Sequence, residues 1–478
     1  MIISRRKALA GGLTASAALA GVACTAETPA KTPDVVSDLG ALVTNARDFG
    51  IKGGEVDESK PFQDAIDFAQ KNGLALYLPA GSYMADGIVL RDRTRLIGAG
   101  PDSTVIRAVP GSTNGALLNI TRGIVRSVLV EGVGLEGAGN GEQHGIHVYA
   151  RRRDNDEASG LWHSDFKNIH VYNFGGAQIW LQGGGTDALD PVQFLTMHNV
   201  EIERLPGSPR SIGLLMSGQV NQTVWLDGRI DGISSPKDSP GVNVKVCRQL
   251  DQYDPSTDGS SKYVSNRTGH THLFAGVSFQ KAQLGVYVDN AESITFDTCH
   301  FEGLGSGLLF SDTGQNRVDR SHFANSARGE GEPFSIRAIN GALVSGSANV
   351  FIGDYGDMAS ADDSGATVAL SDTLGNDPAV TRNLTRRMDP ATEIDVGGAI
   401  TVALNASPTA IRSVIPTRFP GERVVFKASG GSVFFEPGGN IDFEGISTPL
   451  EILAGGTLTL VRFDSGPAWS IEATHRSR

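Results

Sequence analysis

Cysteine is scarce in this sequence, which limits the covalent stabilisation and metal binding to expect. Only three cysteines occur, and Cys24 lies in the N-terminal segment, which leaves Cys247 and Cys299. Cys299 occupies an alternate apolar position of a short strand pattern, which favours a buried free thiol over a disulfide. No Cys/His spacing in the sequence indicates a zinc site.

An excess of positive charge is also missing. Lysine and arginine number 41 against 53 aspartate and glutamate residues, a net charge of −12, which argues against nucleic acid as a partner. This balance does not exclude a polyanionic substrate, because a local basic groove can lie on an acidic protein. The middle of the chain also lacks long amphipathic helical patterns, which argues against leucine-rich or βα solenoids.

The N-terminus has the pattern of a targeting segment. Arg5 and Arg6 precede a mildly hydrophobic stretch, rich in glycine and alanine, that ends near Ala23. This pattern is typical of a twin-arginine export signal over residues 1–26 and predicts a periplasmic or extracellular protein. The stretch falls short of the ~20 strongly apolar residues of a transmembrane anchor. The residues around Cys24 resemble the cleavage site of a lipoprotein, in which the cysteine carries a lipid anchor. The alternative is ordinary cleavage of the signal near Ala23 or Ala26.

Glycine is abundant, at 60 of 478 residues against a usual share of about 7%. A short strand pattern also recurs through the middle of the chain. In each copy apolar residues alternate with variable ones, and successive copies are separated by 33, 35, 28, 44, 22 and 28 residues. Repeats of ~20–50 residues indicate a solenoid or a propeller, and variable spacing indicates loops inserted at the turns. The first apolar residues of the copies are Ile146, Ile179, Leu214, Val242, Val286, Leu308 and Ile336.

Two further strand patterns precede the recurring one, as in residues 192–195 and 199–203, or 293–297 and 298–302. Three short strands per repeat, joined by Gly, Asn and Asp turns, predict a parallel β-helix in which stacked coils build one continuous core. A propeller would need hairpin turns and a regularity of ~40 residues, which the sequence does not show.

The region that starts at Ala46 carries a series of short motifs. They are Ala-Arg-Asp-Phe-Gly at 46–50, an amphipathic segment at 61–69, Tyr-Leu-Pro-Ala-Gly-Ser-Tyr at 77–83 and Leu-Ile-Gly-Ala-Gly at 96–100. They resemble the start of the pectate-lyase-like, rhamnogalacturonase/epimerase-type β-helix superfamily. One turn differs from the superfamily pattern, because Gly53-Gly54-Glu55 replaces the usual Gly-Asp-Gly. The resemblance covers residues ~46–350 and implies a capping helix at the open N-terminal end. Proteins of this superfamily include polysaccharide lyases, glycoside hydrolases, epimerases, tailspikes and binding proteins.

The predicted fold is therefore all-β, namely a right-handed parallel β-helix with an N-terminal capping helix and a small C-terminal β-sandwich-like domain. Seven short alternating runs from residue 400 onward predict that C-terminal domain, which resembles modules that assist trimerisation or bind carbohydrate. The expected boundaries are 1–26 for the signal, 27–45 for a linker, 46–358 for the β-helix, 359–392 for a second linker and 393–478 for the C-terminal domain.

Residues between the core positions of a strand point outward, so the recurring strand predicts two outward rows on one face. Aromatic rings, amides, a lysine and a carboxylate along one face are typical of a saccharide-binding surface. The long loops at 150–163, 183–191 and 247–271 are expected to wall a groove on this face. The first row is His147, Trp180, Leu215, Asn243, Tyr287, Leu309 and Arg337, and the second is Tyr149, Gln182, Ser217, Lys245, Asp289 and Ser311.

This face suits a lyase that removes a proton next to a uronate carboxylate. His147, Tyr149 and Lys245 are the predicted acid and base groups, and Arg151 the predicted carboxylate ligand. The alternative for the arginines at 151–153 is a solvated loop paired with its own acidic residues. Contacts to the sugar are predicted for Trp180, Gln182, Asn243, Tyr287 and Asp289.

The second strand pattern offers a rival face. One outward row holds His170, Glu201, His300 and His322, and the next holds Tyr172, Glu203, Gln280 and Glu302. Paired carboxylates there suit a glycoside hydrolase, whose two carboxylates lie ~5–9.5 Å apart. Glu302 is therefore a further catalytic candidate and His300 a further binding candidate, with an ordinary solvated face as the alternative.

The sequence favours an exported enzyme that cleaves a uronate-containing polysaccharide by β-elimination. A glycoside hydrolase and a carbohydrate-binding surface module remain alternatives. The Asn-Thr-Asp strand and Gly-Asp-Asp turn of the superfamily's hydrolases are absent, and so is an aspartate cluster like the calcium site of pectate lyases. No metal or cofactor is therefore predicted, and calcium is left as an alternative that the sequence does not indicate. The expected partners are a polysaccharide and, through the C-terminal domain, two further copies of the chain in a homotrimer.

Overall fold

The computed structural model describes residues 42–475 with internal gaps. The gaps are 113, 122, 140, 151–158, 185–190, 325–332, 353–356, 362–364, 372–373, 376–384, 389–392, 396–400, 406–408, 416–422, 430, 437–438, 443–447 and 462–468. The predicted export signal, the Cys24 lipid anchor and Arg151 lie outside the described residues. Among the described residues, no helix is long and apolar enough to cross a membrane.

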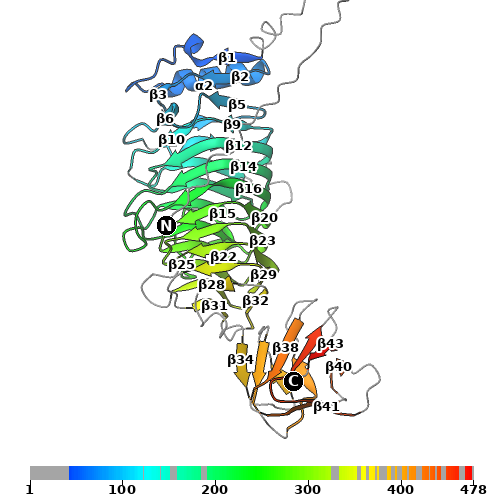
Figure 1. Cartoon of the computed structure of the whole chain (residues 1–478). Coiled ribbons are helices and arrows are strands. Elements are labelled where there is room, and N and C mark those ends of the chain that lie inside the picture. The colour runs from blue at the N-terminus through cyan, green and yellow to red at the C-terminus, as the bar shows by residue number, and fades with distance from the viewer. Residues whose placement is uncertain are drawn as a thin grey trace, which may run out of the picture. The chain divides into compact units, whose positions relative to one another are not determined.

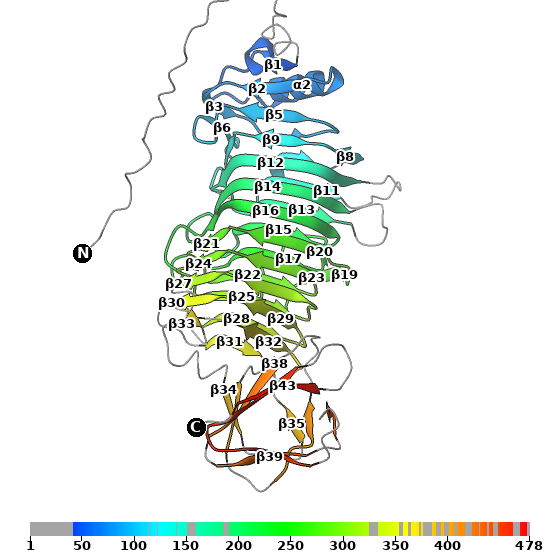
Figure 2. The same ribbon diagram turned by 45° about the vertical axis from the view of Figure 1, so that its right-hand side comes forward.

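Residues 43–375 form a parallel β-helix whose coils stack along one axis (Figures 1 and 2). One face is a ten-stranded sheet, here called sheet B. Each of its strands pairs in parallel with the strand of the next coil. Its strands are β4 (Ile88–Val89), β7 (Ala116–Ile120), β11 (His144–Ala150), β13 (Ala177–Gly183), β15 (Ile212–Ser217), β17 (Val242–Cys247), β22 (Leu284–Asp289), β25 (Ser306–Ser311), β28 (Phe334–Ile339) and β31 (Asp357–Ala361).

The remaining strands of the coils form a 21-stranded sheet, here called sheet A. They are β1 (Val43–Asn45), β2 (Ala75–Leu78), β3 (Gly81–Met84), β5 (Arg95–Gly98), β6 (Thr104–Arg107), β8 (Ile124–Arg126), β9 (Leu129–Glu131), β10 (Gly134–Glu136), β12 (Gly160–Tyr172), β14 (Val192–Glu203), β16 (Val220–Asp231), β20 (His270–Ala275), β21 (Ser278–Gln280), β23 (Glu292–Asp297), β24 (His300–Glu302), β26 (Asn316–Asp319), β27 (His322–Ala324), β29 (Leu343–Ser347), β30 (Val350–Ile352), β32 (Thr367–Ser371) and β33 (Leu374–Gly375). The predicted three strands per coil are confirmed, because two of the three follow each other in sheet A.

Sheet A bends where its two strands meet, and residues in the left-handed region make the bend. Asn168 and Asn199 occupy this corner in β12 and β14 with φ of 49° and 50°. Asparagine tolerates this conformation better than most residues. The Asn199 amide also donates to Asn168 Oδ1 across the two coils at 3.0 Å. Asparagine therefore makes the bend in these two coils, whereas other residues, such as Gly276 and Thr298, hold positive φ in later coils.

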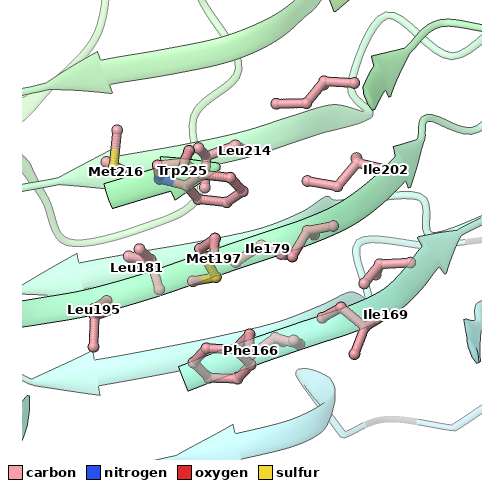
Figure 3. Close-up of a cluster of buried hydrophobic side chains, with 14 of the residues drawn as sticks. Phe166, Ile169, Ile179, Leu181, Leu195, Met197, Ile202, Leu214, Met216 and Trp225 are labelled. Carbon is pink, nitrogen blue, oxygen red and sulfur yellow. The ribbon is translucent and has the colours of Figure 1, made fainter. Parts of the chain in front are cut away.

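The core lies between the two sheets and runs the length of the β-helix. Phe166, Met197 and Trp225 are in register on β12, β14 and β16, and they face side chains such as Leu181 and Met216 of sheet B (Figure 3). Further along, phenylalanines of successive coils stack on one another. Cys299 is buried in this core as a free thiol, which confirms the prediction for it.

The predicted strand alignment is correct for most of sheet B and wrong at β17. Ile146, Ile179 and Leu214 pair in one row, as do Val286, Leu308 and Ile336. However, Leu214 pairs with Val244 rather than with Val242. A slip of two residues keeps every side chain on its face, so alternation in the sequence cannot detect it. Lys245 consequently lies in the row of His147 and Trp180, and Asn243 leaves that row.

The N-terminal end is closed as predicted. A short helix η1 (Ala46–Phe49) is followed by α2 (Ser59–Lys71), which packs the buried Phe62, Ala65, Ile66 and Ala69 on the first coils. Glu58, only 6% exposed, accepts from the backbone nitrogens of Lys52 at 2.6 Å and Gly53 at 3.1 Å. Its carboxylate therefore joins the glycine turn to the start of α2.

The Glu58→Ala substitution is expected to lower the free energy of unfolding by about 1.5–3 kcal/mol, the range for hydrogen bonds to a charged group. A lower midpoint in chemical denaturation would show this loss. Glu55→Ala serves as the control, because Glu55 is 76% exposed in its ion pair with Arg107 and surface pairs contribute about 0–1 kcal/mol. Equal midpoints for the two variants would contradict the structural role of Glu58.

The β-helix extends beyond its predicted end at residue 358. β31, β32 and β33 pair in parallel with β28, β29 and β30, so residues 357–375 complete one more coil. The prediction of a linker at 359–392 is therefore wrong for residues 359–375. The strands of this last coil are short and rich in Ala, Ser and Gly. They lack the alternation of large apolar residues that is typical of the other coils. β1 likewise begins inside the linker expected at 27–45.

The C-terminal strands have their own core, which includes Phe426, Phe435 and Trp469. They are β34 (Thr385–Met388), β35 (Glu393–Asp395), β36 (Thr401–Leu404), β37 (Ser413–Ile415), β38 (Arg423–Ala428), β39 (Val433–Phe435), β40 (Ile441–Asp442), β41 (Leu450–Ile452), β42 (Thr457–Val461) and β43 (Trp469–His475). The sheets are mixed, because β34, β36 and β38 pair in parallel whereas β38, β42 and β43 pair antiparallel.

Candidate functional site

The outer face of sheet B, where the site was predicted, is covered over its middle coils. The strands β13, β15, β17 and β22 are buried at every position. Residues 248–265, which we call the cover segment, contribute Leu250, Tyr253 and Tyr263 to an apolar cluster on this face. Within this segment, β18 (Gln249–Leu250) and β19 (Tyr263–Ser265) pair antiparallel. The cluster also contains Trp180, Leu215, Cys247 and Tyr287.

Lys245 holds the cover segment in place and is not available to a substrate. Its side chain is 0% exposed. The ammonium donates to the backbone oxygens of Asp254 at 2.9 Å and Ser256 at 2.6 Å, and to Ser261 Oγ at 2.8 Å. A lysine ammonium has three donors, and these contacts use all of them. The predicted catalytic role of Lys245 is therefore wrong for this structure.

Three predicted sugar-binding residues are also buried in structural contacts. Asn243 is 0% exposed, accepts from Arg204 Nε at 2.9 Å and donates to two backbone oxygens. Tyr287 and Asp289 are 3% and 4% exposed, and Arg248 lies 3.4 Å from the Asp289 carboxylate. These side chains stabilise loops and the cover segment rather than face solvent.

The N-terminal end of the same face stays open at β11, where four of the predicted residues meet, two of them on the buried strand β13. His147 and Tyr149 are half-buried on β11, with ring centroids 5.8 Å apart. The His147 ring stacks on Trp180 of the next coil at 4.4 Å. Gln182 lies beside them in sheet B, where its side chain meets His147 Nε2 at 2.9 Å. His147 and Tyr149 remain catalytic predictions on this open end.

Gln182 determines which nitrogen of His147 carries the proton. Its amide nitrogen donates to the backbone oxygen of Leu250 at 2.8 Å, so its oxygen must be the atom facing His147. That oxygen accepts from Nε2, and Nδ1 of the neutral ring keeps the lone pair. Trp180 is fixed in turn by donation from its Nε1 to Ser217 Oγ at 3.0 Å.

The histidine on this face is held neutral. Burial lowers the pKa of His147 to about 4, against the opposing effect of its hydrogen bond with Gln182. Burial also lowers the pKa of the neighbouring His144 to about 3; its Nδ1 accepts from the backbone nitrogen of Ala177 at 2.9 Å. A neutral imidazole whose Nδ1 carries the lone pair can accept a proton near neutral pH.

Tyr253 of the cover segment forms the boundary of the open end. Its ring centroid lies 5.0 Å from that of His144 and 5.8 Å from that of Trp180. Its hydroxyl donates to the backbone oxygen of Arg210. Sequence reasoning placed Tyr253 in a groove wall but did not predict that the segment lies on the strands.

A cavity of about 470 Å³ opens at the N-terminal coils beside this face. One of its lining residues, Thr121, directly follows Ile120, which pairs with Val148 between His147 and Tyr149. The cavity is therefore one residue position away from the open end of sheet B. Its lining consists of Gln70, Val89, Leu90, Arg91, Asp92, Thr121, Ile124 and Val125.

The rival face has the predicted rows but belongs to sheet A. His170, Glu201, Arg229, Ser278, His300 and His322 follow one another in register. Glu302 and His300 therefore lie on a different sheet from His147, and the structure does not combine them in one site.

Salt bridges occupy Glu203, one carboxylate of the predicted pair on the rival face, together with its neighbours Glu201 and Asp231. One nitrogen of Arg229 contacts Glu203 at 2.7 Å and Glu201 at 3.2 Å, and Arg229 also reaches Asp231 at 3.4 Å. His170, 3.7 Å from the Glu203 carboxylate, is the main cause that lowers the pKa of Glu203. A carboxyl group with a lowered pKa is a poor general acid, which weighs against hydrolysis on this face.

Across the described residues, no group of three or more His, Cys, Asp or Glu side chains is arranged to hold a metal ion. Arg151, predicted to bind a carboxylate, follows Ala150 at the end of β11 and lies outside the described residues.

Comparisons with known proteins bear on the fold and the first coils. Residues 43–130 match the family described as rhamnogalacturonase A/epimerase, pectate lyase-like. The mannuronan C5-epimerase AlgE3 of Azotobacter vinelandii is 41% identical over 101 residues, which are 19% of this chain and 5% of that protein. The chain therefore matches only a small part of that relative's length.

Two solved structures are similar over most of the chain. The A-module of the Azotobacter vinelandii mannuronan C-5 epimerase AlgE4 has a TM-score of 0.51 at 17% identity, covering 69% of this chain and 95% of the module. Tailspike gp49 of Acinetobacter baumannii bacteriophage Fri1, a capsular polysaccharide depolymerase, has a TM-score of 0.47 at 9% identity, covering 90% of this chain and 79% of that one. The family match and the likeness to AlgE4 confirm the predicted superfamily resemblance and the right-handed parallel β-helix.

Proposed function

We propose that the protein acts on a uronate-containing polysaccharide by removing the C5 proton of a uronate unit. His147 is the base, and β-elimination of the substituent at O4 is the outcome. The observation that carries this proposal is the neutral, half-buried His147, whose tautomer is set by Gln182 and which lies beside Tyr149 on the open end of sheet B.

Each step has a residue on or next to β11. The lone pair of His147 Nδ1 accepts the C5 proton. The C4–O4 bond breaks as the C4=C5 double bond forms, and the Tyr149 hydroxyl protonates the leaving oxygen. The uronate carboxylate needs a cation to stabilise the charge that develops at C5. Arg151, two positions after Tyr149 in the sequence, is the residue proposed for this task.

The sequence relative supports chemistry at C5. AlgE3 is named as an epimerase at C5 of mannuronan, and an epimerase must also remove the C5 proton. Epimerisation and elimination thus share their first step and differ in where the next proton is delivered. The half-buried rings of His147 and Tyr149 also offer a surface on which sugars pack.

The test is the ultraviolet absorbance of unsaturated uronates during incubation with a panel of uronate polysaccharides. A steady rise in absorbance is expected, and Tyr149→Phe should slow it because the leaving oxygen loses its proton donor. New reducing ends without absorbance would indicate hydrolysis instead. The absence of any product from a broad panel would indicate a binding module.

The pH dependence of the reaction should report the lowered pKa of His147. The base works when neutral, so the rate should fall only as the pH drops below about 4, instead of below the ordinary histidine value near 6.5.

We call the fall of the rate at low pH the acid limb of the pH–rate profile. The Gln182→Glu substitution is expected to shift the midpoint of this limb upward by about 1–3 pH units, since a nearby carboxylate stabilises the imidazolium. Gln193→Glu on sheet A is the matched control and should leave the limb unchanged. A limb that is the same in both variants would exclude His147 as the titrating base.

A further inference from the structure

We infer that the cover segment makes the His147 site a chain-end site, so that the enzyme releases short products from one end of its polysaccharide. This inference rests on the proposed function and adds the mode of action to it. It concerns how many sugar units the open face can hold and in which direction the polymer can continue.

The cover segment closes sheet B immediately after the candidate residues. Trp180, the stacking partner of His147, is only 4% exposed, and Leu215 and Lys245, which follow it in the same row, are both 0% exposed. A polymer that lies along the coils past His147 would have to occupy the volume that Leu250 and Tyr253 fill. The polymer can therefore continue only towards the N-terminal coils.

The open part of the face is short. It consists of β7 and β11, two coils that span on the order of 10 Å at a spacing of ~4.8 Å per coil. α2 covers the first coils beyond it, since it packs on β2, β4 and β5. A face bounded at both ends suits a terminal fragment of a polysaccharide better than the middle of a long chain.

The closure is built into the fold. Lys245 uses its three donors on Asp254, Ser256 and Ser261, and Gln182 donates to Leu250. Removing a partner from such buried contacts leaves polar groups unsatisfied, which destabilises the closed arrangement. Gln182 therefore orients His147 with its oxygen and fixes the cover segment with its nitrogen.

The test compares the viscosity of a uronate polysaccharide with the absorbance of the unsaturated product over the same incubation. For the native enzyme, the absorbance should rise while the viscosity stays almost constant, and size-exclusion chromatography should show one short product from the first minutes. A rapid viscosity drop at low absorbance would overturn the chain-end mode and leave the proposed elimination intact. A flat absorbance trace would overturn both proposals.

Two variants of the cover segment test whether it is the cause. Tyr253→Ala removes the ring next to His144 and Trp180, and it should produce a several-fold larger viscosity drop per unit of absorbance. Tyr263→Ala removes a ring of the same segment whose centroid lies 5.3 Å from the Arg248 guanidinium. Tyr263→Ala should keep the native ratio. If Tyr253→Ala also keeps it, the cover segment does not impose the chain-end mode.

Discussion

The His147→Gln substitution is expected to reduce turnover about 100- to 10,000-fold, the usual contribution of a positioned general base. Glutamine can retain a hydrogen bond with Gln182 but has no nitrogen lone pair to accept the C5 proton. The rate of absorbance increase at saturating polysaccharide measures the loss. The unfolding midpoint should stay near that of the native protein, because His147 is half-buried at the edge of the open face.

His163→Gln is the matched control for this substitution. His163 is exposed on β12, and its ring stacks on Phe194 at 4.6 Å. It lies on sheet A and should retain full activity. A loss of less than tenfold for His147→Gln, or an equal loss for both variants, would contradict the assignment of His147 as the base.

The Phe301→Ala substitution is expected to lower the free energy of unfolding by about 3–5 kcal/mol. Phe301 is 0% exposed and lies between Phe279 and Phe323, with ring centroids 4.9 and 4.6 Å away and nearly parallel planes. The cavity would persist because backbone hydrogen bonds fix the ~4.8 Å spacing of the coils on either side. Denaturant unfolding followed by circular dichroism measures the change.

Ile352→Ala provides the comparison on a neighbouring outward position. Ile352 is 39% exposed, and its truncation should change the free energy of unfolding by about 0.5 kcal/mol or less. A Phe301→Ala loss below about 1 kcal/mol would mean that the aromatic stack does not stabilise the β-helix as a continuous core.

Alternation in the sequence predicted the fold because it records which face of each strand is buried. The three strands per coil and most of the sheet B pairing follow from it, whereas the capping helix was implied by the superfamily resemblance. It could not distinguish Val242 from Val244 as the partner of Leu214, since a slip of two residues preserves the pattern. The role predicted for Lys245 depended on that alignment.

The covered part of the face did leave a signal in the sequence. Strands buried on both faces read as nearly continuous apolar runs, as in Leu214-Leu215-Met216 and Val286-Tyr287-Val288. The 44-residue interval before Val286 supplies the segment that covers them. The hydrogen bonds of Gln182 and Lys245 could not be predicted, because they depend on how residues 248–265 lie across four coils.

The most direct test of the central claim is proton nuclear magnetic resonance of a uronate polysaccharide incubated with the enzyme in D₂O. Removal of the C5 proton predicts loss of the H5 signal together with a vinylic H4 signal from the new unsaturated end, both absent with His147→Gln. Deuterium at C5 without a vinylic signal would keep the proton transfer and assign the outcome to epimerisation. An unchanged H5 signal in material that is nevertheless cleaved would contradict the account.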